Sequence, residues 1–144
     1  MIDLGRDEEI VTQAKVHWAC LIPHILLLFV YGLGIITGAP VLIRMFTTDM
    51  YITSKRLYGK VGLINTKTLD TPLNKVNTVS IESGLLGKIL GYGTIHITSS
   101  SGSYEFKSIK SPEVFKAALL EEIDKFDEKR IKKQATEMAA AMKS

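Results

Sequence analysis

The feature that most constrains this chain is an uncharged stretch near its N-terminus. No Asp, Glu, Lys or Arg occurs from Trp18 to Ile43, and residues 18–36 form the most apolar part. This length is close to the roughly 20 residues that a helix needs to cross a bilayer. A helix that is apolar all round must be buried on every side, and the rest of a 144-residue chain is too small to enclose it. We therefore expect a transmembrane helix over residues 18–36.

Other interpretations of this stretch are a cleaved signal peptide and a shallow membrane hairpin. The signal peptide fits poorly, because four acidic residues precede the stretch and its apolar part begins late. Two complete spans do not fit either, since residues 18–43 cannot supply roughly 20 residues twice. We favour a single span with a short second piece over residues 40–46. The alternative is a hairpin that turns at Gly38-Ala39-Pro40.

The membrane anchor should combine interfacial aromatic residues with aliphatic residues of the span. We expect it to consist of Trp18, Leu26, Leu27, Leu28, Phe29 and Tyr31. The excess of basic residues lies on the C-terminal side, which has Arg44, Lys55, Arg56 and Lys60 against Arg6 and Lys15 before the stretch. The positive-inside rule therefore places the C-terminal part in the cytoplasm.

From Thr48 onward the sequence changes to short alternating segments separated by turn residues, which is typical of antiparallel strands. We expect strands over residues 49–53, 56–61, 65–69, 76–81, 94–98 and 104–109. Residues 83–93 carry four glycines in an apolar stretch, which predicts a tight glycine-hinged loop with one helical turn. Short strands at hairpin spacing favour a small barrel or two packed sheets.

A helix should begin at Ser111-Pro112-Glu113, which combines a capping serine, a proline at the first helical position and an acid in the first turn. Apolar residues then recur at helical spacing at Phe115, Leu119, Ile123 and Phe126. We expect this stripe to cap the strands. Residues 127–144 are charged and then Ala-rich, and we expect them to project as a solvated helical tail. Packing against a neighbouring subunit is the alternative.

Several motifs, read in order, resemble the bacterial pleckstrin-homology-like (bacterial PH) domain family of short membrane proteins. They comprise residues 51–57, Gly62, residues 71–76, residues 86–95, and Ile109 before Ser111-Pro112. The resemblance runs from about residue 17 to residue 126. It implies an α+β fold, a small β-barrel or two packed antiparallel sheets closed by a C-terminal helix, on the cytoplasmic face of a bacterial inner membrane. Family members commonly carry two membrane helices before the barrel, and this chain departs by its shorter apolar stretch.

These observations divide the chain into three parts. Residues 1–46 are expected to form the tail and membrane segment, residues 47–126 the PH-like domain with its capping helix from residue 112, and residues 127–144 the helical tail. The role of the family is poorly defined, so the resemblance implies architecture more than activity.

No pattern in the sequence indicates catalysis or a bound cofactor. The three histidines, His17, His24 and His96, are scattered and lack metal-ligand spacing. Cys20 is the only cysteine and lies in the apolar stretch, where we interpret it as a small hydrophobic residue. Residues 87–93 lack a phosphate-loop pattern. We therefore expect that the protein is not an enzyme and that it has no catalytic residue, no metal-binding residue and no cofactor.

The basic residues are the remaining candidates for a binding site. Residues 47–110 carry eight basic and four acidic side chains, which favours an acidic partner but is too weak an excess for nucleic acid. The candidate basic rim consists of Lys55, Arg56, Lys60 and Lys88. We predict a membrane-anchored module that binds a protein or peptide. The alternatives are an oligomeric scaffold at the membrane and anionic lipid headgroup binding.

Overall fold

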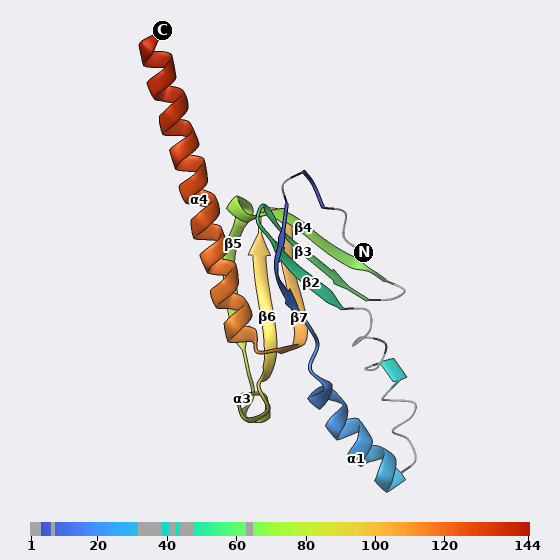
Figure 1. Ribbon diagram of the computed structural model, residues 1–144. Helices are drawn as coiled ribbons and strands as arrows, with labels where there is room; N and C mark the ends of the chain where they lie inside the picture. Colours follow the sequence, from blue (N-terminus) through green and yellow to red (C-terminus); the bar gives the residue numbers. More distant parts are fainter. Residues whose placement is uncertain (1–3, 7, 32–38, 41–42, 44–47, 63–64) are drawn as a thin grey trace.

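Two antiparallel sheets and a long C-terminal helix make up the fold (Figure 1). The computed structural model describes residues 4–6, 8–31, 39–40, 43, 48–62 and 65–144. Sheet A has the strand order β1-β2-β3-β4, and sheet B has the order β5-β6-β7. The strands are β1 Ile10–Ala14, β2 Asp49–Thr53, β3 Arg56–Val61, β4 Lys67–Pro72, β5 Val76–Glu82, β6 Tyr92–Ser99 and β7 Gly102–Lys110.

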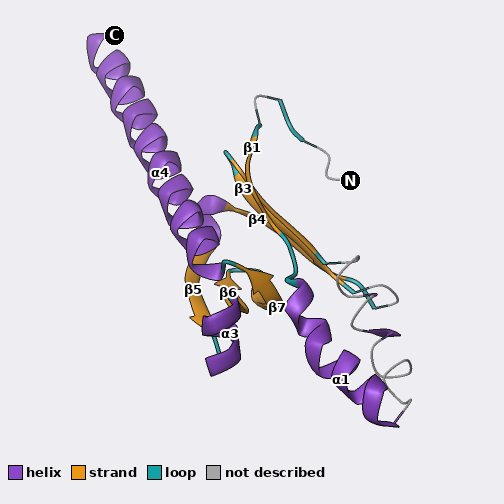
Figure 2. Cartoon of the chain, turned by 60° about the horizontal axis from the view of Figure 1, so that its bottom comes forward, coloured by secondary structure: helices purple, strands orange, loops and turns teal. Residues whose placement is uncertain are grey.

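The helical elements lie between some of these strands and after the last one. They are the 3-10 turns η1 Trp18–Leu21 and η2 Leu73–Lys75 and the α-helices α1 Ile22–Tyr31, α3 Leu85–Leu90 and α4 Pro112–Lys143. Figure 2 shows α3 and α4 close to sheet B and α1 apart from both sheets. The sequence placed β2 and β3 at their observed bounds. The strand predicted over residues 65–69 begins and ends earlier than β4, which extends to Pro72.

Strand β1 precedes the apolar stretch, in a part of the chain that the sequence analysis assigns to a tail. It pairs with β2 in antiparallel register, with Ile10 opposite Thr53 and Ala14 opposite Met50. Just beyond it, Val16 forms a bridge with Ile109 of β7 and thereby joins the two sheets at one corner. The sheets therefore contain residues from both sides of the apolar stretch.

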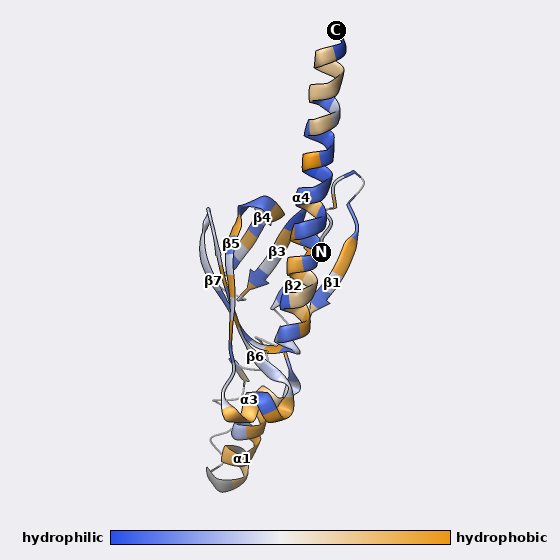
Figure 3. Cartoon of the chain, turned by 90° about the vertical axis from the view of Figure 1, so that its left-hand side faces the viewer, coloured by the Kyte–Doolittle hydropathy of each residue, from blue (hydrophilic) through white to orange (hydrophobic). Residues whose placement is uncertain are grey.

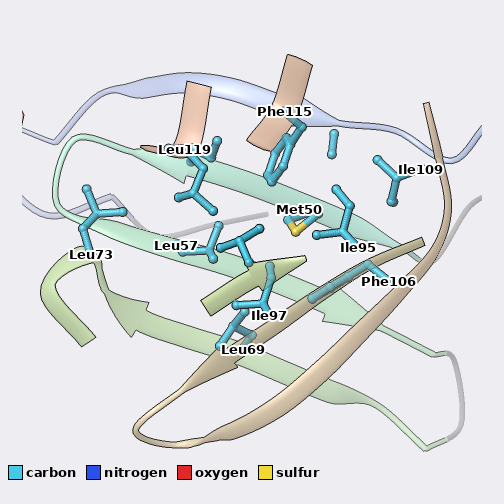
Figure 4. Packing of buried hydrophobic residues seen from close by; sticks show 13 residues of the cluster. Met50, Leu57, Leu69, Leu73, Ile95, Ile97, Phe106, Ile109, Phe115 and Leu119 are labelled. Carbon is cyan, nitrogen blue, oxygen red and sulfur yellow. The ribbon is translucent and has the colours of Figure 1, made fainter. Parts of the chain in front are cut away.

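One hydrophobic core lies between the inner faces of the two sheets (Figure 4). Its side chains alternate along the strands, so each strand turns every second residue inward. Phe115 and Leu119 of α4 cover one side of this core, and both are buried. The predicted capping role of the helix is therefore confirmed. Apart from the Val16–Ile109 bridge, the described strands of the two sheets do not pair into a closed barrel, so the packed-sheet form of the prediction is the one observed.

The apolar stretch begins with η1 and continues into α1. We predicted a transmembrane helix over residues 18–36, but the described part of the chain contains no helix that is both long and apolar enough to cross a membrane. Helix α1 ends at Tyr31, and residues 32–38, which include the predicted turn at Gly38, lie outside the described residues.

The glycine-rich residues between β5 and β6 form the short helix α3, in agreement with the predicted helical turn. Gly91 ends this helix with a φ of 77°, in the left-handed region that favours glycine. The chain can therefore reverse at once into β6. Helix α3 is consequently held at the tip of the β5–β6 connection.

Helix α4 begins at Pro112, as predicted, and runs to Lys143. Its first half lies on the sheets, whereas every residue from Glu128 to Ser144 is exposed. Figure 1 shows this second half projecting beyond the sheets, away from α1 and α3. The helix thus extends in the direction opposite to α1.

Candidate functional site

Strand pairing determines where the apolar stretch leaves and rejoins the folded domain. Strand β1 ends at Ala14, which lies opposite Met50 near the start of β2. The chain therefore leaves sheet A and returns to it at the same end of the sheet. We call this the apolar end; it also carries α3, which Figures 1 and 3 show on the same side of the sheets as α1.

The start of the apolar stretch is fixed to sheet B by backbone hydrogen bonds. The His17 amide donates to the Ser108 carbonyl at 2.6 Å, and the Lys110 amide donates to the Lys15 carbonyl at 2.8 Å. The His17 Nδ1 atom then accepts a hydrogen bond from the Ala19 amide at 3.0 Å and so caps η1. These contacts give the outgoing chain a defined direction.

The expected anchor residues of the described chain are solvent-facing. Trp18 is 61% exposed, Leu26 69%, Leu27 44% and Phe29 93%. Such a row of large apolar side chains is unusual for a surface that meets only water. The side chains of Leu28 and Tyr31 lie outside the described part of the chain.

The candidate basic residues do not gather into one rim. Lys55 and Arg56 lie at the β2–β3 turn, which is the end of sheet A remote from the apolar stretch. Lys60 lies opposite Asp49 at the apolar end, and Lys88 lies on α3. Lys55 and Arg56 are therefore separated from Lys60 by roughly the length of β2, about 16 Å at 3.3 Å per residue.

At the β2–β3 turn, Arg56 holds the N-terminal segment against the sheet. Its Nε atom lies 3.0 Å from Glu8 Oε1 and its Nη1 atom 2.7 Å from Asp70 Oδ2. The neighbouring Lys55 ammonium donates to the Arg6 carbonyl. Arg56 therefore has a structural role in this turn, which sequence reasoning did not anticipate.

Glu8 is the buried acid of this cluster, and its ionisation is coupled to folding. Burial by itself would raise the pKa of the Glu8 carboxyl, but hydrogen bonds from Thr53, the Gly5 amide and Arg56 outweigh burial and lower the pKa. The same contact raises the pKa of Arg56, with the hydrogen bond to Glu8 as the largest cause. No local sequence signal marks Glu8, because its side-chain partners Thr53 and Arg56 are more than 40 residues away.

Glu8→Gln is expected to lower the free energy of unfolding by about 1–2 kcal/mol at neutral pH, because a charge-assisted hydrogen bond is lost. The folded-state pKa of Glu8 lies below its ordinary value of 4.5, so its contribution is complete above that value and is lost as the pH falls through the folded-state pKa. The difference between wild type and variant should therefore shrink on acidification. Urea titrations over this pH range, with Glu9→Gln as the exposed control, measure it; a constant difference would contradict the assignment.

A basic groove lies between the same turn and α4. It has a volume of about 410 Å³ and is lined by Ser54, Lys55, Phe126, Lys129, Arg130 and Lys133. Arg130 also contacts Asp127 at 3.3 Å, and Lys133 contacts Glu137 at 3.9 Å. Four cations around one apolar ring suit an acidic, partly apolar ligand. Of these lining residues, sequence reasoning singled out only Lys55 as a binding candidate, because α4 is distant from the turn in sequence.

The described residues contain no group of three or more His, Cys, Asp or Glu side chains that could hold a metal ion. His17 caps η1, His24 lies against the Cys20 carbonyl at 3.2 Å, and His96 pairs with Glu82 at 3.3 Å. Each histidine thus has a separate local role. The described surface thus has two ends of different chemistry, one apolar and one basic.

Comparison with known proteins agrees with this architecture. The family model described as "Bacterial PH domain" matches residues 10–125, which include β1 and the part of α4 that lies on the sheets. This chain belongs to the bacterial PH domain family. No match was found among curated proteins or among solved structures.

Proposed function

We propose that this protein is a binding module held at a membrane, in which the apolar stretch between β1 and β2 enters the lipid and leaves it on the same side. The domain itself then presents its far end to a protein partner. PH-like domains are typically non-catalytic binding modules, and the candidate site has the character of a recognition surface.

The antiparallel pairing of β1 with β2 is the observation that carries this proposal. A stretch that crossed the membrane once would leave β1 and β2 on opposite sides, where they could not share backbone hydrogen bonds. Residues 18–43 are also too few for two crossings of roughly 20 residues each. Of the two arrangements considered from the sequence, the shallow hairpin around Gly38-Ala39-Pro40 is therefore favoured over the single span.

Charge supports the cytoplasmic face of a bacterial inner membrane as the location. With a hairpin, the basic residues on both sides of the apolar stretch face the same compartment, and these are Arg6, Lys15, Arg44, Lys55, Arg56 and Lys60. Basic residues near membrane segments favour the cytoplasmic side. The hairpin thus strengthens a charge argument that is weak for a single span.

The partner should be an acidic protein segment rather than a lipid headgroup. Lys55 lies at the end of sheet A remote from the apolar stretch, about 16 Å along β2. That separation exceeds the Debye length of about 8 Å at physiological salt. The groove beside Lys55 therefore lies on the side of the domain that faces away from the lipid. Headgroup binding through Lys55 and Arg56 is the weaker alternative.

A scaffold formed by self-association is the second candidate function. Ile131, Met138 and Met142 lie on the exposed second half of α4 and are 60%, 67% and 86% exposed. With Ala135 they recur at alternating spacings of four and three residues, which is the seam pattern of a coiled coil. Two short repeats of this pattern would hold the α4 helices of two copies together only weakly. Self-association would therefore need the membrane to concentrate the chains.

Labelling of single cysteines in intact bacterial cells tests the hairpin. Gly5→Cys and Ser144→Cys are placed singly in a Cys20→Ala background, and a membrane-impermeant maleimide is applied before and after permeabilisation. We expect both positions to be protected in intact cells and both to react after permeabilisation, with the chain in the membrane fraction. Cys20→Ala without a new cysteine is the control. Opposite accessibility of the two positions would overturn the hairpin.

A further inference from the structure

Helix α3 directs apolar side chains outward, away from the core. Leu85 is 84% exposed, Leu86 67% and Ile89 78%, although the helix has only six residues. Its one buried residue is Gly87. A helix this short gains little from its own hydrogen bonds, and these three side chains add nothing to the core. Only an apolar environment outside the domain could cover this face of α3.

The position of α3 is tied to that of the apolar stretch. Tyr92 follows α3 at the start of β6, and its ring stacks on the His17 ring with 5.8 Å between centroids. His17 immediately precedes η1, whose first residue is the exposed Trp18. Figure 3 shows that α3 and α1, both carrying hydrophobic residues, lie at the same end of the molecule. Tyr92 and Trp18 are residue types that prefer the membrane interface.

The charges around α3 complement an anionic surface. Lys88 lies on α3 itself, and Lys15 and Lys110 lie beside each other where the chain enters η1. All three side chains are exposed. Glu113, at the start of α4, is the acidic residue beside Lys88 in the neighbouring hollow. Lysine stems can lie along apolar surface while the ammonium stays among headgroups, and each basic residue near an anionic leaflet favours binding.

We propose that α3 is a second membrane contact, in which Leu85, Leu86 and Ile89 enter the interfacial region of an anionic lipid bilayer. This inference rests on the proposed function, because it takes the lipid at the apolar end to be the phase that covers α3. The depth is that of an interfacial helix, about 5–10 Å below the surface. Lys88, Lys15 and Lys110 lie at headgroup level.

Two membrane contacts, the apolar stretch and α3, determine how the domain is oriented on the bilayer, which one contact alone would leave open. The apolar stretch alone would leave the tilt of the domain relative to the membrane undetermined. With α3 also bound to the membrane, the β2–β3 turn and η2 lie at the end of the domain away from the lipid. The basic groove then faces the aqueous side.

An environment-sensitive fluorophore attached to the full-length chain tests this contact. The dye NBD is attached at Leu86→Cys in a Cys20→Ala background, and the protein is reconstituted into phosphatidylethanolamine vesicles with about a third phosphatidylglycerol. We expect a blue-shifted emission and at least roughly twofold quenching by lipids with spin-labelled acyl chains, as the interfacial depth requires. The matched control is the same dye at Asn74→Cys, which lies in the exposed turn η2 at the far end.

The outcomes separate the two proposals. Quenching at position 86 with none at position 74 supports the membrane contact of α3. Protein that floats with the vesicles while the dye at 86 reports water overturns this inference and leaves the proposed function intact. Protein that does not float with the vesicles overturns both. As a second variant, Leu85→Ser with Ile89→Ser should reduce quenching at position 86 without releasing the chain.

Discussion

Deletion of residues 1–46 is expected to abolish cooperative folding of this protein. The remaining fragment would contain all strands except β1, which supplies the partner of β2 and the buried side chain of Ala14. It would also lose the bridge from Val16 to Ile109 and the ion pair of Glu8 with Arg56. The edge of β2 and the buried core residues behind it would then meet water. We expect no cooperative urea transition and no dispersed amide spectrum.

A matched variant keeps β1 and removes the apolar stretch together with the four residues that follow it. Residues 18–47 are replaced by about eight Gly and Ser residues, which span roughly 16 Å. This variant should unfold cooperatively, remain in the aqueous phase without detergent and fail to float with vesicles. If the 47–144 fragment instead folds as cooperatively as this variant, β1 is dispensable and its place in the domain has been misjudged.

Gly59→Ala is expected to destabilise the protein by about 3 kcal/mol through overpacking. Gly59 lies on β3 under the ring of Phe106 of β7. A β-carbon at this position would lie 2.5 Å from Cζ and 2.8 Å from Cε1 of that ring. Phe106 is only 1% exposed, so moving the ring aside would disturb the packing of its buried neighbours. Denaturant titration of the full-length protein in mild detergent measures the loss.

Gly84→Ala is the matched control, since a β-carbon there meets no described atom within 4 Å. Its effect should stay within about 0.5 kcal/mol. In a Phe106→Leu background, Gly59→Ala should lower the free energy of unfolding by less than in the wild type. The reason is that leucine lacks the ring atoms that the new β-carbon would meet. Equal costs for the two glycines would show that the close approach of Gly59 to Phe106 does not limit packing.

Local patterns explain which elements could be predicted. The alternation in residues 49–61 reports one buried face, and it placed β2 and β3 correctly. Ser111-Pro112 marked the first residue of α4 by its chemistry, although Ser111 has a φ of 47° and makes no capping hydrogen bond from its side chain within the described chain. Short-range signals therefore placed the bounds of β2 and β3 and the start of α4, but the predicted serine cap of α4 was wrong.

Features that depend on distant residues could not be predicted. Ile10–Ala14 is a strand because β2 lies beside it, and the residues between them obscure that relationship. The Glu8–Arg56 pair and the groove formed by Lys55 with α4 likewise join segments far apart in sequence. The four candidate basic residues are divided between two ends of the molecule for the same reason. Strand pairing also shows that the strands before and after the apolar stretch lie side by side, which composition alone left open.

The projecting half of α4 gives the protein a stiff arm. Glu128–Lys143 lies beyond the sheets and is exposed throughout, and at 1.5 Å per residue it adds roughly 24 Å of reach. If lipid covers the opposite end of the molecule, a protein bound to the last turns of α4 is held at a fixed distance from the bilayer. Lengthening or shortening this rod by whole turns would then change the height while keeping the same side chains towards the bound protein.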